Sequence, residues 1–308
     1  MKKLITALTS LLLSAIMLAG CAQAPAQQGG GGGTITLLRG AFTELEVLMQ
    51  MAAMLIEEHT DLTVVWQDPM HTVMAANATI DGHADLYVSY DGTLLTTIMG
   101  YDPSAVPPGE VLFEWVQNRA PEATGLTLLA PFGFENTYIL AVQRDFAEEH
   151  NLRTISDLVP FGPELVFGAE HEFFELEGTM RFVPFNERYG FQWRDSRSMD
   201  IALKYAAMEN RSIDVTMVYS TDGLNMYFDL FLLEDDLNFF PEYNAAFQFR
   251  HTLFEEFAKS APNLREVLSM LNGMIDNYTM LYMNYAVDAL GENEQDVARQ
   301  FLTDRGLL

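Results

Sequence analysis

From Thr34 onward, the chain alternates short β-type runs with amphipathic helical segments. Three early runs rich in Thr, Val, Ile and Leu have the length and composition of buried strands: residues 34–38, 62–66 and 84–90. Helical patterns separate them, with apolar residues at helical spacing, over residues 43–56 and 72–81. Further runs predict strands at residues 136–142, 165–169 and 213–219, and a helical region from Leu264 onward. This rhythm predicts an α/β sheet with helices on both faces.

The first helical segment carries its own start signal. Thr43-Glu44-Leu45-Glu46 has the T-x-x-E spacing of a capping box, in which the two outer side chains satisfy free backbone N–H groups. We therefore expect the helix to begin here, with Thr43 as its N-cap.

Two stretches of the chain resemble each other. Residues 85–92 and 214–223 each follow a predicted helix, form a strand that ends in tyrosine (Tyr90 and Tyr219), and break shortly afterwards at Asp-Gly. In open α/β sheets, ligands bind at the carboxyl ends of strands. The repetition indicates two half-domains that face each other across a cleft, whereas the alternative is coincidence, because Asp-Gly turns are common.

The N-terminus has the pattern of a targeting segment. A positive start and a short uncharged apolar run cover residues 1–20, and Leu18-Ala19-Gly20-Cys21 resembles a bacterial lipobox, in which the cysteine is acylated. Residues 21–33 are glycine-rich and have no bulky apolar side chain, as in a flexible tether. We therefore expect a cleaved signal peptide, lipidation at Cys21 and a body held outside the cytoplasmic membrane.

Composition and charge exclude several classes of protein. With 43 acidic against 17 basic residues and a formal charge of −26, a nucleic-acid binder is excluded, and the single cysteine excludes a disulfide framework. The six histidines show no metal-binding spacing, and neither a nucleophile elbow nor a phosphate-binding loop is present. Carboxylate pairs are too numerous to exclude by counting, but nothing in the sequence indicates catalysis or a cofactor.

Seven segments with distinctive sequences occur in order along the chain, at residues 42–44, 84–87, 133–138, 167–174, 219–223, 238–241 and 284–288. Together they resemble the lipid-anchored substrate-binding proteins of bacterial glycine betaine/carnitine/choline ABC transporters. The resemblance implies a type II periplasmic-binding-protein fold, in which two lobes joined by two crossings close on a ligand in the cleft between them. It further implies a first lobe of residues 34–135 plus 245–308 and a second lobe of residues 136–244.

The same resemblance implies a cage of four tyrosines around the ligand's quaternary ammonium. Carried over by motif, they are Tyr90, Tyr138, Tyr219 and Tyr243. A trimethylammonium group has no N–H to donate, whereas an aromatic face offers it a negative quadrupole and wide dispersion contact.

The resemblance implies fewer contacts at the other end of the ligand. Thr93 matches a family hydroxyl that contacts the polar tail, Asn136 matches a pocket-lining position, and Phe42 borders the pocket from the first loop. Some family members clamp a ligand carboxylate with an arginine where this chain has Leu176. Arg39 is a candidate replacement, and a surface arginine is the alternative.

Asp91 stands where the family commonly has threonine. If its carboxylate points into the cage, it favours a cation without a carboxylate of its own, such as choline. Glycine betaine, choline and carnitine therefore stay open as ligands.

The expected function is capture of a quaternary-ammonium osmoprotectant outside the cell membrane and its delivery to the permease subunits of an ABC transporter. No enzyme activity, cofactor, metal or nucleic acid is expected. The alternatives are a lipid-anchored extracytoplasmic enzyme, a protein of the same fold with a different small ligand, and a structural or adhesion lipoprotein.

Overall fold

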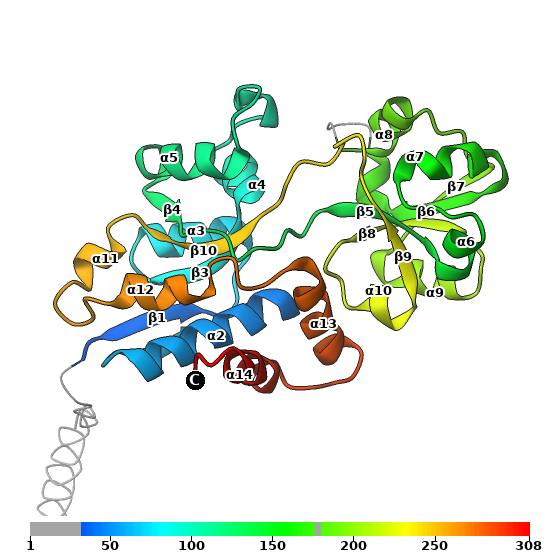
Figure 1. The fold of residues 1–308 in the computed structure, drawn as a ribbon. Coiled ribbons are helices and arrows are strands. Elements are labelled where there is room, and N and C mark those ends of the chain that lie inside the picture. The colour runs from blue at the N-terminus through cyan, green and yellow to red at the C-terminus, as the bar shows by residue number, and fades with distance from the viewer. Residues whose placement is uncertain (1–31, 176–179) are drawn as a thin grey trace, which may run out of the picture.

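The molecule consists of two lobes joined by two extended segments (Figure 1). The structure, a computed structural model, describes residues 32–175 and 180–308. The expected signal peptide, Cys21 and Leu176 lie outside the described residues. We name residues 34–134 and 243–308 the first lobe and residues 138–240 the second lobe; Tyr243 and Asn244 belong to the first lobe because they pack against it. Each lobe contains one five-stranded sheet, which confirms the predicted α/β class.

The first lobe has the strand order β2-β1-β3-β10-β4. Its N-terminal part contains β1 (Thr34–Leu38), α2 (Thr43–His59), β2 (Thr63–Gln67), α3 (Thr72–Ile80), β3 (Leu86–Tyr90), α4 (Asp91–Thr93), a π-helical turn (Leu94–Ile98), a 3-10 turn (Pro103–Ala105), α5 (Leu112–Thr124) and β4 (Leu126–Leu128). Its C-terminal part contains β10 (Ala245–Arg250), α11 (Leu253–Glu256), α12 (Leu264–Leu268), a 3-10 turn (Ser269–Leu271), α13 (Asn277–Asp288) and α14 (Glu294–Asp304).

The second lobe has the strand order β7-β6-β8-β5-β9. It contains β5 (Tyr138–Gln143), α6 (Arg144–Glu149), α7 (Ile155–Leu158), a 3-10 turn (Val159–Glu164), β6 (Val166–Glu170), a 3-10 turn (His171–Phe174), α8 (Phe182–Tyr189), β7 (Asp195–Met199), α9 (Ile201–Glu209), β8 (Val215–Tyr219), α10 (Leu224–Tyr227) and β9 (Leu230–Leu233). Within the described residues, no helix is both long and apolar enough for a membrane crossing.

Helices cover both faces of the first sheet, as the alternating pattern predicts. Leu37 and Val88 pack on one face with α2 and the C-terminal helices, whereas Leu38 and Tyr87 pack on the other with α3. Helix α2 is buried on nearly all sides over residues 47–56, because α12, α13 and α14 cover the side turned away from the sheet.

The predicted capping box at the start of α2 is wrong, although the helix itself begins there. Thr43 is the first helical residue and the cap position is Phe42, which makes no side-chain cap bond. The Thr43 hydroxyl donates to Asp288 at 2.5 Å, and the Glu46 carboxylate accepts from the Gly40 N–H at 2.7 Å. A distant residue, Asp288, has thus taken the Thr43 side chain away from capping, and the loop before the helix has taken the Glu46 side chain.

The internal repetition in the sequence corresponds to a repeated piece of structure. Strand β3 pairs with β1 in parallel and with β10 antiparallel, and β8 pairs in the same way with β6 and β5. Asp85, before β3, accepts the Thr36 N–H at 2.7 Å, and Asp214, before β8, accepts the Val166 N–H at 2.8 Å. The two lobes therefore hold their central strands by the same device.

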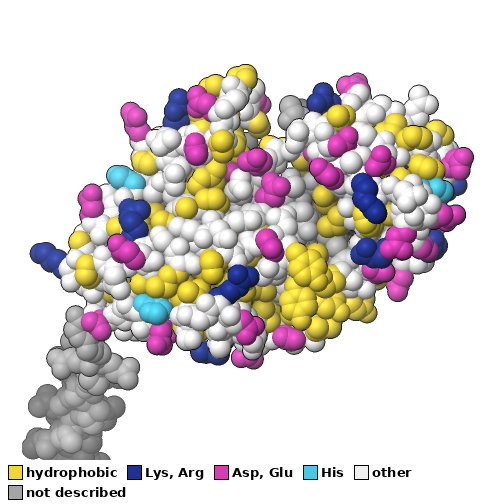
Figure 2. Space-filling model, viewed as in Figure 1, with side chains coloured by type: hydrophobic (Ala, Val, Ile, Leu, Met, Phe, Trp, Pro, Cys, Tyr) yellow, Lys and Arg dark blue, Asp and Glu magenta, His cyan; other side chains and the backbone are white. Residues whose placement is uncertain are grey.

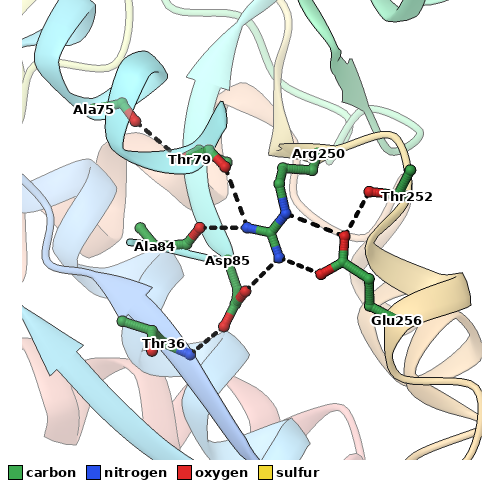
Figure 3. Close-up of polar contacts among 8 residues, drawn as sticks. All are labelled: Thr36, Ala75, Thr79, Ala84, Asp85, Arg250, Thr252 and Glu256. Carbon is green, nitrogen blue, oxygen red and sulfur yellow. Dashed lines mark hydrogen bonds and ion pairs between the residues drawn. The ribbon is translucent and has the colours of Figure 1, made fainter. Parts of the chain in front are cut away.

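The first lobe adds an arginine to this device (Figure 3). The Arg250 guanidinium donates to Asp85 at 2.7 Å, to both carboxylate oxygens of Glu256, and to the carbonyls of Thr79 and Ala84. In the second lobe, the equivalent aspartate, Asp214, has only a longer and more exposed arginine contact, from Arg194 at 3.4 Å. Arg250 thereby ties β10 to the loop before β3 and to α11.

The two segments that join the lobes, residues 135–137 and 241–242, are hydrogen-bonded to each other and to the residues beside them. Glu135 and Asn244 form an isolated antiparallel bridge, and the Asn136 N–H donates to the Tyr243 carbonyl at 3.0 Å. The residues that flank this bridge therefore lie where the two lobes meet.

Candidate functional site

A cavity of about 840 Å³ is lined by residues from both lobes and from both joining segments. All eight ligand-binding residues predicted from the sequence line it: Arg39, Phe42, Tyr90, Thr93, Asn136, Tyr138, Tyr219 and Tyr243. Their roles in binding stay predictions, but the fold brings them to one cavity. Acidic side chains are spread over both lobes on the face seen in Figure 2.

Two of the four tyrosines form a stacked pair in the first lobe. Tyr90 ends β3, and Tyr243 comes shortly before β10, the antiparallel neighbour of β3. Their ring centroids are 5.2 Å apart with 28° between the ring planes. The Tyr90 hydroxyl donates to Glu44 at 2.5 Å, and the Tyr243 hydroxyl lies 2.6 Å from the Thr93 hydroxyl. Each ring is therefore fixed by the backbone at one end and by a contact of its hydroxyl group at the other.

The other two tyrosines form a matching pair in the second lobe. Tyr138 begins β5 and is the register partner of Tyr219, the last residue of β8. Their ring centroids are 4.8 Å apart with 21° between the planes, and their hydroxyl oxygens are 3.2 Å apart. Each lobe thus contributes one tyrosine from the end of a central strand and one from the start of the neighbouring antiparallel strand or from just before it.

Both glycines of the Asp-Gly repeats are explained by close approach. A Cβ on Gly92 would lie 2.2 Å from the Tyr243 ring, and a Cβ on Gly223 would lie 2.4 Å from the Tyr285 backbone nitrogen. Gly92 therefore makes room for the first tyrosine pair, whereas Gly223 lets the second lobe approach α13 of the first.

Arg39 reaches the cavity wall but is already engaged. Its guanidinium pairs with Glu46 at 2.6 Å and lies over the Trp66 ring, 4.8 Å from the centroid. Phe42 is exposed at the start of α2. Arg39 would therefore have to give up its ion pair with Glu46 in order to bind a ligand carboxylate.

The hypothesis that Asp91 places a carboxylate in the cage is wrong. Asp91 is fully buried and absent from the cavity wall, because its short side chain turns toward Asn244, just after the second joining segment. It accepts the backbone N–H groups of Gly92 at 2.7 Å and Asn244 at 2.9 Å, and the Asn244 side-chain amide at 3.0 Å. Burial raises the pKa of the Asp91 carboxyl to about 7.

The cavity has a different buried carboxylate, Glu44, whose role the sequence reasoning missed. Glu44 is 1% exposed and accepts hydrogen bonds from Tyr90 at 2.5 Å and from the amides of Asn136 and Asn284, each at 3.1 Å. Burial raises the pKa of its carboxyl, and contacts with the side chains of Thr221, Tyr90, Asn284 and Asn136, in decreasing order, oppose the rise. A signal was available, because Glu44 lies on the same helical stripe as the buried residue Leu48.

A second buried carboxylate lies behind the tyrosine pair of the second lobe. Glu170 pairs with Lys204 at 3.5 Å, and their side chains are 4% and 0% exposed. The Lys204 ammonium is 5.6 Å from the Tyr219 ring centroid. Neither residue lines the cavity. No group of three metal-ligating side chains comes together in the described part of the chain.

The chain matches, over residues 33–304, the family model described as the substrate binding domain of ABC-type glycine betaine transport system. The carnitine transport binding protein of Listeria monocytogenes is 32% identical over 306 residues, which cover 98% of this chain and 97% of that protein. The ergothioneine transport permease/ergothioneine binding protein of Helicobacter pylori is 31% identical over 266 residues, covering 86% of this chain and 46% of that protein.

Among solved structures, one described as a glycine betaine/carnitine/choline ABC transporter superposes with a TM-score of 0.81 at 28% identity. The superposition covers 89% of this chain and 98% of that chain. It confirms the predicted two-lobe fold.

Proposed function

The chain belongs to the family of substrate-binding domains of ABC-type glycine betaine transport systems, and from this premise we propose that it captures a quaternary-ammonium compound and delivers it to an ABC permease. The observation that carries the proposal is the pair of stacked tyrosines in each lobe, both on the wall of one cavity. Closure of the lobes would bring the two pairs around one ammonium group. The expectation that the chain is not an enzyme agrees with this family of substrate-binding proteins.

The energetics are adequate only if the whole cavity takes part. An aromatic face contributes about 0.5–2 kcal/mol to binding a cation, so four faces contribute roughly 2–8 kcal/mol. Micromolar affinity needs about 8 kcal/mol after the costs of association are met. Contacts at the other end of the ligand must therefore supply the remainder.

A different small ligand in the same cavity is the second candidate. The Helicobacter pylori relative is named for ergothioneine, and the Listeria monocytogenes relative for carnitine. The two names show that ligand identity varies between relatives of this chain.

We propose further that the mature chain begins at a lipidated Cys21 and works at the outer side of the cell membrane. Replacing Cys21 with serine should move the protein from the membrane fraction to the soluble fraction and abolish incorporation of labelled palmitate. Unchanged fractionation and labelling would contradict the anchor.

Calorimetric titration of the purified protein with glycine betaine, choline and carnitine tests the capture function. We expect at least one of them to bind at micromolar concentration, and the double variant Tyr138→Ala/Tyr219→Ala to bind it at least about tenfold more weakly. Tyr278→Ala is the matched control, because Tyr278 is 68% exposed on α13 and does not line the cavity. If none of the three binds, or if the control loses as much affinity as the double variant, the proposal fails.

A further inference from the structure

Glu44 is a buried carboxylate at the cavity wall whose hydrogen-bond donors are all uncharged. They are the Tyr90 hydroxyl and the amides of Asn136 and Asn284. Over residues 32–175 and 180–308, none of the ion pairs includes Glu44. A buried carboxylate without a counter-ion is costly, so a cation arriving next to it is stabilised more than it would be in water.

The two side-chain amides that face Glu44 each have an oxygen atom that points elsewhere and needs a donor of its own. Because the Asn136 and Asn284 NH2 groups point at Glu44, their side-chain oxygens have no hydrogen-bond partner among the described residues, although both oxygens are buried. Both asparagines line the cavity. A buried acceptor without a donor carries a desolvation penalty, which a ligand that brings an O–H donor can relieve.

The rest of the cavity wall is also acidic. Asp222 and Asp288 line it together with Glu44, whereas the cationic candidates on the wall are Arg39 and His71. Arg39 is already neutralised by Glu46, at 2.6 Å. A ligand that brings its own carboxylate would meet three carboxylates in this space and no free guanidinium.

The second lobe provides the internal contrast. Its buried carboxylate, Glu170, has Lys204 as a resident counter-ion, and the pair lies outside the cavity wall. The second tyrosine pair therefore needs no charge from the ligand, whereas the first lobe presents a carboxylate, Glu44, for which the described residues hold no counter-ion.

Resting on the proposed function, we infer that the ligand is a quaternary ammonium of net positive charge that carries a hydroxyl, as choline does. Glu44 is its counter-ion, and the side-chain oxygen of Asn136 or of Asn284 accepts its hydroxyl hydrogen. Zwitterions such as glycine betaine bind more weakly, because their carboxylate lies among acceptors and like charges.

A ligand series measured by calorimetry on the wild-type protein separates the parts of this inference. Choline carries both features, its methyl ether lacks the O–H donor, glycine betaine lacks the net charge, and 3,3-dimethylbutanol lacks the cation but keeps the shape. We expect choline to bind at least about tenfold more tightly than glycine betaine and more than about threefold more tightly than its methyl ether. The neutral alcohol should not bind measurably.

The variant Glu44→Gln tests the assigned counter-ion. It should weaken choline binding by at least about tenfold and change glycine betaine binding by less than about threefold. Asp91→Asn is the matched control, since Asp91 is also a buried carboxylate beside the first tyrosine pair but faces away from the cavity. It should leave the ratio of choline to betaine affinity unchanged. Thermal melts show whether each variant is folded, and the wild-type series stands if Glu44→Gln is not.

The outcomes separate this inference from the proposed function. If glycine betaine binds as tightly as choline, if the methyl ether equals choline, or if folded Glu44→Gln keeps the ratio, the inference is overturned while quaternary-ammonium capture stands. If no quaternary ammonium binds, or if 3,3-dimethylbutanol equals choline, the proposed function itself fails.

Discussion

The two tyrosine pairs have the same backbone origin and different electrostatic surroundings. In each lobe, one ring comes from the end of a central strand and the other from next to its antiparallel neighbour, and the two rings stack. Behind the second pair, Glu170 is compensated by Lys204, whereas beside the first pair Glu44 is held by neutral donors alone. The same backbone framework thus carries a buried carboxylate with a counter-ion in the second lobe and a buried carboxylate without one in the first lobe.

The difference indicates where stability and recognition reside. A buried ion pair that does not face the cavity contributes to the fold of its lobe, and its removal should affect unfolding more than ligand choice. An uncompensated carboxylate in the cavity lowers the stability of the empty protein and makes its affinity depend on the charge of the ligand.

The largest expected effect comes from breaking the buried ion pair between Lys204 and Glu170 in the second lobe. Lys204→Met leaves Glu170 buried and unpaired, so we expect a loss of about 3–5 kcal/mol in the free energy of unfolding, measured by urea titration. The double variant Lys204→Met/Glu170→Leu removes both charges and should recover most of that loss. Equal destabilisation by the single and double variants would show that packing, and not charge, explains the effect.

A smaller effect is expected where the two lobes differ in anchoring their central strands. Arg250→Met leaves Asp85 and the Thr79 and Ala84 carbonyls without their donor, which should cost about 2–3 kcal/mol of unfolding free energy. Arg194→Met, which removes the exposed arginine contact of the equivalent aspartate Asp214, should cost no more than about 0.5 kcal/mol. Similar losses for the two variants in parallel urea titrations would contradict the comparison.

The smallest effect is the pH dependence of cation binding. Burial raises the pKa of Glu44, so as pH falls through that raised value the carboxyl takes up a proton and loses its charge. Choline affinity, measured by calorimetry between pH 8 and pH 5, should therefore fall with acidification, by roughly tenfold or less. Glycine betaine affinity should change less.

Other groups on the cavity wall require a control for this pH effect. Tyr90 faces Glu44 but keeps its proton, because burial raises its pKa still further, and the Asn136 and Asn284 amides do not titrate. His71, Asp222 and Asp288 also line the cavity. The slope should disappear in Glu44→Gln. A slope that survives in this variant would show that Glu44 does not cause the effect.

Much of the framework could be predicted from the sequence. The runs that end in Tyr90 and Tyr219 predicted two strands in equivalent places, and both the repeated Asp-Gly and the preceding aspartates proved to have structural roles. These signals are local, because strand periodicity and a close approach by glycine are both properties of short segments. The positions of Tyr138 and Tyr243 came from the family resemblance and not from periodicity.

Side-chain direction and charge balance could not be predicted in the same way. Asp91 follows Tyr90 directly, yet its carboxylate turns to Asn244, which is distant in sequence. Glu44 resembled an ordinary first-turn glutamate, a residue type that is almost always exposed. Its burial depends on Asn284, 240 residues further along the chain. Such contacts exist only once the lobe is assembled.

A crystal structure of the protein with choline would show whether the tyrosine pairs of the two lobes close on one ammonium group. We expect the choline nitrogen within about 6 Å of all four ring centroids, those of Tyr90, Tyr138, Tyr219 and Tyr243. A choline bound elsewhere, or held by the rings of one lobe alone, would contradict this expectation.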